Sequence, residues 1–134
     1  MKVEGWRLDG ASRQKFTDLR VWQAARALAG CVYRATNRLP REERFGLCAQ
    51  LRRASVSVLT NIAEGAKREH RNDYAHFLNI AEGSLAEIQC LLVLCGDLGF
   101  LLDPHSELRT EADRTARMLT ALRKAVLRRT ESRR

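Results

Sequence analysis

Proline and β-branched residues are scarce in this sequence. Its 134 residues include only two prolines, Pro40 and Pro104, and are rich in Ala, Leu, Arg and Glu. This composition favours helix over strand. No apolar run approaches the ~20 residues that cross a membrane, and residues 1–14 lack the apolar core of a signal peptide. We therefore expect a helical protein of the cytoplasm that is not inserted in a membrane.

Motifs for metal binding and catalysis are also missing. The four cysteines form no C-x-x-C pair, and the three histidines lie outside the spacings of zinc ligands. The Glu-x-x-His motif of di-iron bundles is absent, as are the nucleophile elbow and the phosphate-binding loop. We expect no cofactor, no metal and no enzymatic activity, and we expect each cysteine to be a buried, reduced thiol.

Positive charge is what the sequence has in excess. The formal net charge is +8 and the isoelectric point is about 10.0, which suits an acidic partner such as nucleic acid. The excess is uneven, because residues 73–103 contain five acidic residues and no lysine or arginine. The basic surface is therefore expected on the rest of the chain.

Four stretches show apolar residues at helical spacing. The first covers about residues 18–37 and stops before Pro40, and the second ends before the charged residues 68–72. The third is expected to begin at a cap formed by Asn72 or Asp73 and to end near a left-handed Gly99. Asp103 and Pro104 then open the fourth. We predict an all-α, antiparallel up-down-up-down four-helix bundle over residues 17–130, with a flexible segment at 1–16 and a basic tail at 131–134.

The second helical stretch has an additional apolar face. Its residues lie well over 100° around the helix from the core stripe at Val58, and they are Ala49, Val56, Leu59 and Ala63. An apolar face that the subunit core does not cover needs a partner. We therefore predict that the protein forms a homo-oligomer through these residues.

The pentapeptide NIAEG occurs twice, at residues 61–65 and 79–83. In a helical hairpin that turns near residue 70, the two copies lie opposite each other. This register pairs Arg53 with Glu87, Ser57 with Gly83, Asn61 with Asn79, and Glu64 with His76. Arg52 is the alternative partner of Glu87, and two solvated faces are the alternative to a seam. Gly65 and Gly83 are expected to let the backbones approach closely.

Basic residues lie opposite the apolar stripes and form the candidate nucleic-acid surface. They are Arg20, Arg34 and Arg38 on the first helix, Lys67, Arg68 and Arg71 in the following loop region, and Arg114, Arg117, Lys124 and Arg128 on the fourth helix. No exposed aromatic platform is evident, so we expect phosphate contacts with little base stacking. The alternative is a solvated face balanced by Glu107, Glu111 and Asp113.

Three stretches resemble the four-helix-bundle proteins named for the 23S ribosomal RNA intervening sequence. They are FTDLRVWQAA, LPREERFGLCAQLRRASVSVLTNIAEG and FLNIAEGSLAE, and the resemblance covers residues 16–102. Leu59 departs from the family pattern, which usually has a proline close by. The resemblance implies a ring-shaped assembly, typically a homopentamer, and kinship with the accessory variability protein of diversity-generating retroelements.

Charge and resemblance together give two hypotheses. The first is a non-enzymatic oligomeric bundle that binds nucleic acid, RNA in particular, through its basic outer surfaces. The second is a protein-interaction scaffold, for example an accessory subunit of a reverse transcriptase, that makes no nucleic-acid contact of its own.

Overall fold

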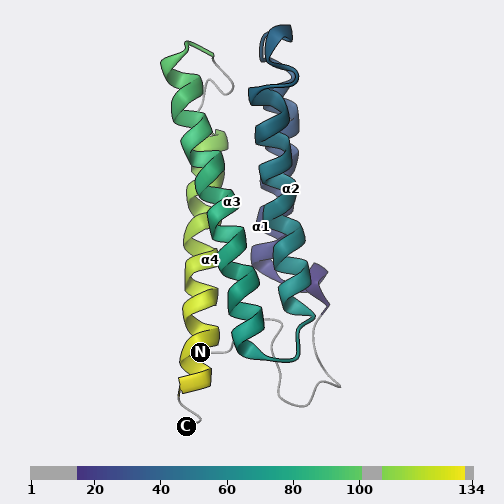
Figure 1. Ribbon diagram of the computed structural model, residues 1–134, viewed down its shortest axis with the longest axis vertical. Helices are drawn as coiled ribbons and strands as arrows, with labels where there is room; N and C mark the ends of the chain where they lie inside the picture. The colour runs from purple at the N-terminus through teal and green to yellow at the C-terminus, as the bar shows by residue number, and fades with distance from the viewer. Residues whose placement is uncertain (1–14, 101–106, 132–134) are drawn as a thin grey trace.

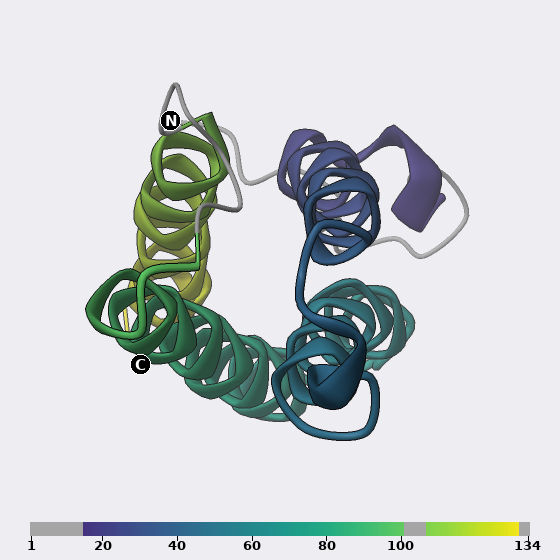
Figure 2. The same cartoon turned by 90° about the horizontal axis from the view of Figure 1, so that it is seen from above.

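The computed structural model describes residues 15–100 and 107–131, which form a four-helix bundle without strands. The helices run up, down, up and down (Figure 1) and occupy the corners of a square in the view from above (Figure 2). The elements are η1 (Phe16–Asp18), α1 (Arg20–Thr36), η2 (Arg41–Glu43), α2 (Leu47–Ala66), α3 (Arg71–Asp97) and α4 (Glu107–Glu131). The predicted all-α bundle is confirmed.

The apolar stripes of the four helices meet in one core. Val32, Val58, Ile62, Leu85 and Leu119 are fully or almost fully buried there. Burying a side chain of this size contributes about 1.5–3 kcal/mol relative to leaving it exposed, so the stripes are the main source of stability. Helices α1 and α3 stand at diagonal corners, and within the described residues none of their Cα atoms approach within 8 Å of each other (Figure 2).

The two ends of α3 differ in how well the sequence predicted them. At the C-terminal end, Gly99 has φ of 78°, and the amide of Phe100 donates to the Cys95 carbonyl at 2.9 Å. This is the predicted left-handed cap, in the form of a Schellman motif. At the N-terminal end the predicted cap is wrong, because α3 begins at Arg71 with His70 as its N-cap, and Asn72 and Asp73 lie inside the first turn.

The predicted boundaries of the bundle need one change. Phe16, assigned to the flexible segment, packs against the core and meets the Trp22 ring edge-on, with 5.1 Å between centroids. Phe16 therefore belongs to the bundle. The described part of the N-terminal segment begins at Lys15, Glu131 of the expected tail is the last residue of α4, and Asp103 and Pro104 lie outside the described residues.

Helix α3 is long and apolar enough to cross a membrane by length and composition alone. A core helix of a soluble bundle meets the same criterion, so this single helix is weak evidence for a membrane span. Helix α3 packs against α2 and α4. The helix also carries the carboxylates of Glu82 and Glu87. These features fit a helix that belongs to the core of the bundle.

Candidate nucleic-acid interface

Nearly all the candidate nucleic-acid residues lie on the surface. Arg71 is half-buried and the other nine cations are exposed. They do not form one continuous patch. The α2–α3 turn, which carries Lys67 and Arg68, lies at the same end of the bundle as the C-terminal end of α4, whereas Arg38 lies at the opposite end (Figure 1).

Helix α4 carries the densest group of these cations. A shallow groove of about 540 Å³ runs along it, lined by Ala116, Arg117, Thr120, Ala121, Lys124 and Arg128. Three of these residues are small or uncharged and three are cationic. The groove is thus shallow and bordered by guanidinium and ammonium groups. The backbone of a polyanion can bind along such a surface.

Acidic residues are confined to the two ends of α4. Glu111 pairs with Arg114 at 3.4 Å, and Asp113 accepts a hydrogen bond from Gln89 at 2.9 Å. Between Asp113 and Glu131 the sequence contains no acidic residue at all. Among the described side chains, none forms an ion pair with Arg117, Lys124 or Arg128. The alternative of a solvated basic face balanced by acidic residues therefore applies to Arg114 but not to the cations of the groove.

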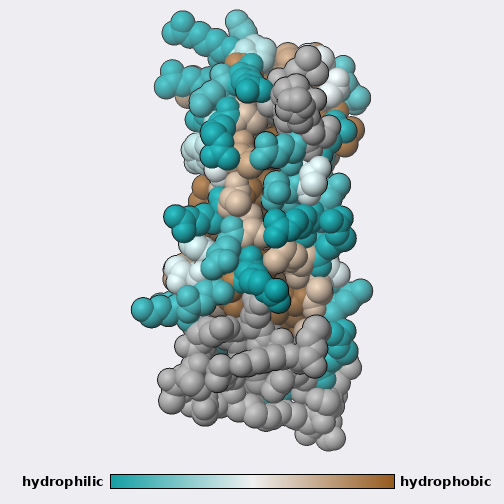
Figure 3. Space-filling view, turned by 180° about the vertical axis from the view of Figure 1, so that it is seen from behind, coloured by the Kyte–Doolittle hydropathy of each residue, from teal (hydrophilic) through white to brown (hydrophobic). Residues whose placement is uncertain are grey.

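Helices α1 and α4 share the face of the bundle opposite α2 and α3 (Figure 2). On this face, hydrophilic side chains flank a narrower apolar strip (Figure 3). Arg34 lies on α1 and contacts the sulfur of Cys31 at 3.5 Å.

The structure separates the two arginines that compete for Glu87. Arg53 Nη2 lies 3.9 Å from Glu87 Oε2, but the two side chains are 75% and 42% exposed, so this contact is long and solvated. Arg52 turns the other way, toward the end of α1, where its Nε donates to Thr36 Oγ1 at 2.8 Å. Arg53 is therefore the arginine that faces Glu87, as the predicted register had it, and the contact between them is solvated.

The middle of the predicted seam differs by one residue. The hydroxyls of Ser57 and Ser84 meet at 2.8 Å, so Ser84, not Gly83, faces Ser57. Asn61 does not bond to Asn79. It donates instead to the carbonyl and the hydroxyl of Ser57 on its own helix, at 2.8 and 3.1 Å. The symmetric pairing of the two asparagines is therefore wrong.

The lower part of the seam also differs from the prediction. Glu64 pairs with Arg68 one turn further along the chain, at 2.8 Å, and not with the exposed His76. Gly65 makes the close helix approach, because a Cβ there would lie 2.8 Å from Phe77 Cβ. A Cβ on Gly83 would meet nothing within 4 Å, so this glycine permits no close contact in the subunit.

Sequence reasoning missed the best-shielded ion pair in the described structure. Glu82 of α3 accepts hydrogen bonds from Arg123 Nε and, at 2.7 Å, from the hydroxyl of Thr120, both on α4. The two charged side chains are only 20% and 26% exposed. The available signal was that residues 73–103 contain no cation, so an inward-facing carboxylate on α3 needs a partner from another helix.

Only some of the residues on α2 that were predicted to form the oligomer interface are exposed to solvent. Ala49 and Val56 are exposed, whereas Leu59 and Ala63 pack partly against the core. Helix α3 adds exposed apolar side chains that the sequence analysis did not single out. They are Ile80, Val93 and Leu94 on the helix and Leu98 at its C-cap, with exposures between 39% and 57%.

The cysteines vary in accessibility. Cys48 and Cys95 are buried, Cys31 is half-buried, and Cys90 is exposed on α3, so the expectation that all four are buried is wrong for Cys90. Burial raises the pKa of the Cys95 and Cys31 thiols. Within the described residues, no three His, Cys, Asp or Glu side chains are grouped so that they could hold a metal ion.

The sequence profile of the family described as 23S rRNA-intervening sequence protein matches residues 17–121, which is most of the chain. No curated protein matches the sequence.

Proposed function

The chain belongs to the 23S rRNA-intervening sequence protein family, and from this premise we propose that it is a non-enzymatic RNA-binding bundle that uses the basic outer faces of α4 and α1. The family description refers to a ribosomal RNA, which favours RNA as the polyanion. The observation that carries the proposal is the α4 groove, where Arg117, Lys124 and Arg128 border small residues in a stretch of the helix that contains no acidic residue.

The surroundings of the groove support phosphate binding. A carboxylate close to it, that of Glu82, is already satisfied by Arg123 and Thr120. Glu82 therefore repels an approaching phosphate less than an unpaired carboxylate would. Contacts with phosphates alone distinguish poorly between sequences, so the groove should bind many RNAs.

We also propose that the protein self-associates through the face formed by α2 and α3. Val56 on α2 and Ile80, Val93 and Leu94 on α3 are exposed apolar side chains of this face. Helices α4 and α1 lie on the other side of the bundle (Figure 2), so their exposed cations would stay accessible. A ring of copies, which the family resemblance implies is a pentamer, would repeat the groove and strengthen weak phosphate contacts through multivalency.

RNA binding is tested by fluorescence anisotropy with a labelled heteropolymer RNA at several salt concentrations. We expect the Arg117→Gln/Lys124→Gln variant to bind less tightly at ~50 mM salt. Each lost phosphate contact should lower the slope of log K against log salt by about 0.7 for single strands, so two should lower it by about 1.4. The matched control is Lys15→Gln/Arg53→Gln, which removes the same charge away from the groove.

The two variants separate the outcomes. If wild-type protein does not bind RNA at ~50 mM salt, the proposal is wrong, because electrostatic binding is strongest at low salt. If both double variants weaken binding equally, RNA responds only to net charge and the groove has no special role.

The protein-interaction scaffold is the second candidate, and the exposed apolar residues at the C-terminal end of α3 and its cap favour it. Val93 and Leu98 are more than half exposed although both are apolar. Their partner could be another protein, such as a reverse transcriptase, instead of a second copy. A pull-down with and without nuclease separates the two functions, because an RNA-mediated partner is lost after digestion and a directly bound protein is retained.

A further inference from the structure

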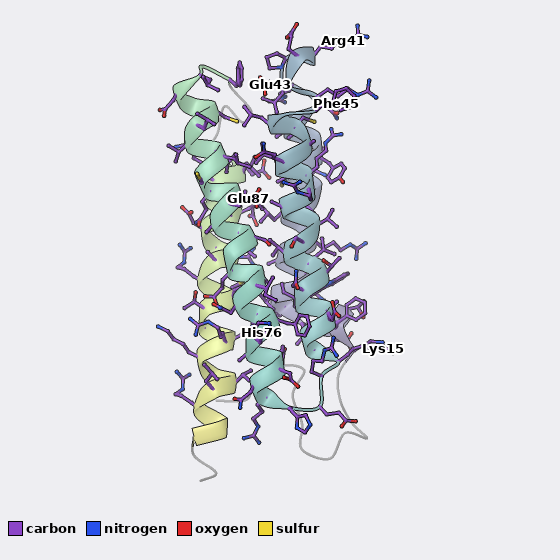
Figure 4. The ribbon with its side chains drawn as sticks, in the orientation of Figure 1. Lys15, Arg41, Glu43, Phe45, His76 and Glu87 are labelled. Carbon is purple, nitrogen blue, oxygen red and sulfur yellow. The ribbon has the colours of Figure 1, made fainter. Side chains whose placement is uncertain are left out.

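The turn between α1 and α2 presents a single aromatic ring to solvent. Phe45 is 86% exposed, whereas the other exposed large hydrophobic residues of the described structure lie between 39% and 57%. Figure 4 shows its side chain projecting from the end of the bundle beside α2, on the same turn as Arg41. The ring contributes almost nothing to the core, so it is accessible to a ligand.

The turn that carries Phe45 is well ordered by its own hydrogen bonds. The amide of Glu43 donates to the Pro40 carbonyl at 2.9 Å, and the amide of Gly46 donates to the Glu43 carbonyl at 3.1 Å. The Glu43 side chain also accepts the first amide of α2, that of Leu47, at 3.2 Å. Phe45 is therefore held on a structured turn, and a ligand would not have to order a flexible loop.

One arginine lies against the ring, and two others lie on the same turn. The guanidinium carbon of Arg44 lies 5.2 Å from the centroid of Phe45, within the range of a cation–π contact. Arg41 and Arg38 lie on the same turn and are exposed. Of the two acids on the turn, Glu43 is engaged at the start of α2, and Glu42 is exposed. An open ring with one arginine against it and two more on the same turn suits a base and its phosphates better than an apolar protein surface.

We propose that Phe45 is a stacking platform for an unpaired nucleobase of single-stranded RNA, with Arg41 and Arg44 contacting the flanking phosphates. This inference rests on the proposed function, to which it adds a site and a substrate class. The α4 groove recognises the phosphate backbone, whereas Phe45 accepts only a base that is not already stacked in a duplex. The sequence-based expectation that there is no exposed aromatic platform is wrong at this position.

The proposal predicts a preference for single strands that depends on the ring. Base stacking on an aromatic side chain changes affinity by roughly 5-fold to 100-fold per base. We expect Phe45→Ala to weaken binding of a single-stranded RNA of about 12 nucleotides by at least 5-fold. Affinity for the perfect duplex of the same sequence should stay unchanged. Because Phe45 is so exposed, the circular dichroism and melting temperature of the variant should match those of wild type.

Two further substitutions separate stacking from apolar contact. Phe45→Leu keeps an apolar side chain without a π-face, so it should lose affinity as Phe45→Ala does, whereas Phe45→Tyr should retain it. A 2-aminopurine base within the single strand reports directly on stacking. Its emission should fall on binding wild-type protein and should fall less on binding Phe45→Leu.

Each remaining outcome overturns the inference in a recognisable way. If wild type binds neither single strand nor duplex at ~50 mM salt, the proposed function and this inference both fail. If wild type binds and Phe45→Ala binds equally well, only this inference fails. If Phe45→Ala changes the sedimentation coefficient of the protein without RNA, the ring belongs to a contact between copies of the chain and not to a nucleobase site.

Discussion

Arg52 of α2 is bound to Thr36 in the last turn of α1, with 2.8 Å between Nε and the hydroxyl oxygen. Its Nη2 donates to Asn37 Oδ1 at 3.0 Å and to the Tyr33 carbonyl at 3.3 Å. The guanidinium also stabilises the negative end of the α1 dipole. Arg52 thereby connects the end of one helix to the first turns of the next.

Replacing this arginine should destabilise the bundle even when the charge is kept. In Arg52→Lys the ammonium cannot reproduce the planar fork, and we expect a loss of about 1–2 kcal/mol in unfolding free energy as hydrogen bonds to a charged group are removed. Urea denaturation followed by circular dichroism measures it. The neighbouring Arg53→Lys is the control and should change stability little, because Arg53 is 75% exposed. Equal effects of the two would contradict this assignment.

The two carboxylates of α3 should differ in their contribution to stability. Glu82→Gln weakens a shielded contact with Arg123 and Thr120, and should cost about 1–3 kcal/mol. Glu87→Gln affects only a long, solvated contact with Arg53, which should matter by less than ~0.5 kcal/mol. Thermal or urea unfolding of the two variants provides the comparison. A larger effect at Glu87 would show that the α2–α3 contact, and not the α3–α4 contact, is the important one.

The two glycines of the repeated pentapeptide should respond in opposite directions to alanine. In Gly65→Ala the new Cβ would meet Phe77 Cβ at 2.8 Å and the Tyr74 carbonyl at 3.3 Å, so we expect a loss of about 1–3 kcal/mol. Gly83→Ala meets nothing and gains helix propensity, so it should stabilise the subunit by about 0.5–1 kcal/mol. If Gly83→Ala instead lowers the oligomer mass in sedimentation, Gly83 lies in the contact between copies.

Thiol labelling should follow burial. At pH 8, Cys90 should react first with a disulfide reagent, because it is exposed, whereas Cys95 should react only when the chain unfolds. Mass spectrometry of the partly labelled protein identifies the order. A fast reaction at Cys95 would mean that the end of α3 opens readily in the native state. Protection of Cys90 in the concentrated protein would place it in a contact between copies.

Raised thiol pKa values should make the fold less stable at high pH. Burial disfavours the thiolate and raises the pKa of Cys95 and Cys31 in the folded protein. The unfolded chain therefore releases these protons at lower pH than the folded chain. The stabilisation is complete below the unfolded thiol pKa and is lost as pH rises through the folded value. Urea titrations between pH 7 and pH 10 should show a smaller decline in Cys95→Ser than in wild type.

The architecture could be predicted from the sequence because it depends on periodicity. Apolar spacing gives the four helices, and glycine supplies the stop of α3 at Gly99 through its left-handed backbone. An apolar stripe is buried whichever residues it packs against, so the core residues can be predicted from the apolar spacing alone. The exposed Phe45 could not be predicted in this way, since its exposure depends on where the α1–α2 turn points.

The helix seam was harder to predict because it depends on register. A shift of one residue places Ser84 and not Gly83 opposite Ser57. It also leaves the two copies of the pentapeptide with different surroundings. Glu64 pairs with Arg68, four residues further along the chain, whereas Glu82 pairs with Arg123 on the neighbouring helix α4. Identical sequences in this protein are therefore not equivalent sites, and their repetition reports helical packing.

Helices α1 and α3 stand at diagonal corners, and their charges are opposite. Helix α1 contains three arginines and no acidic residue, whereas α3 contains four acidic residues and one arginine. This separation gives the bundle a transverse electric dipole. In dilute salt its field extends beyond the ~10 Å Debye length of a 0.1 M solution and exerts a torque on the whole molecule. The protein would thus rotate α1 toward a polyanion during diffusional encounter, before any side chain makes contact.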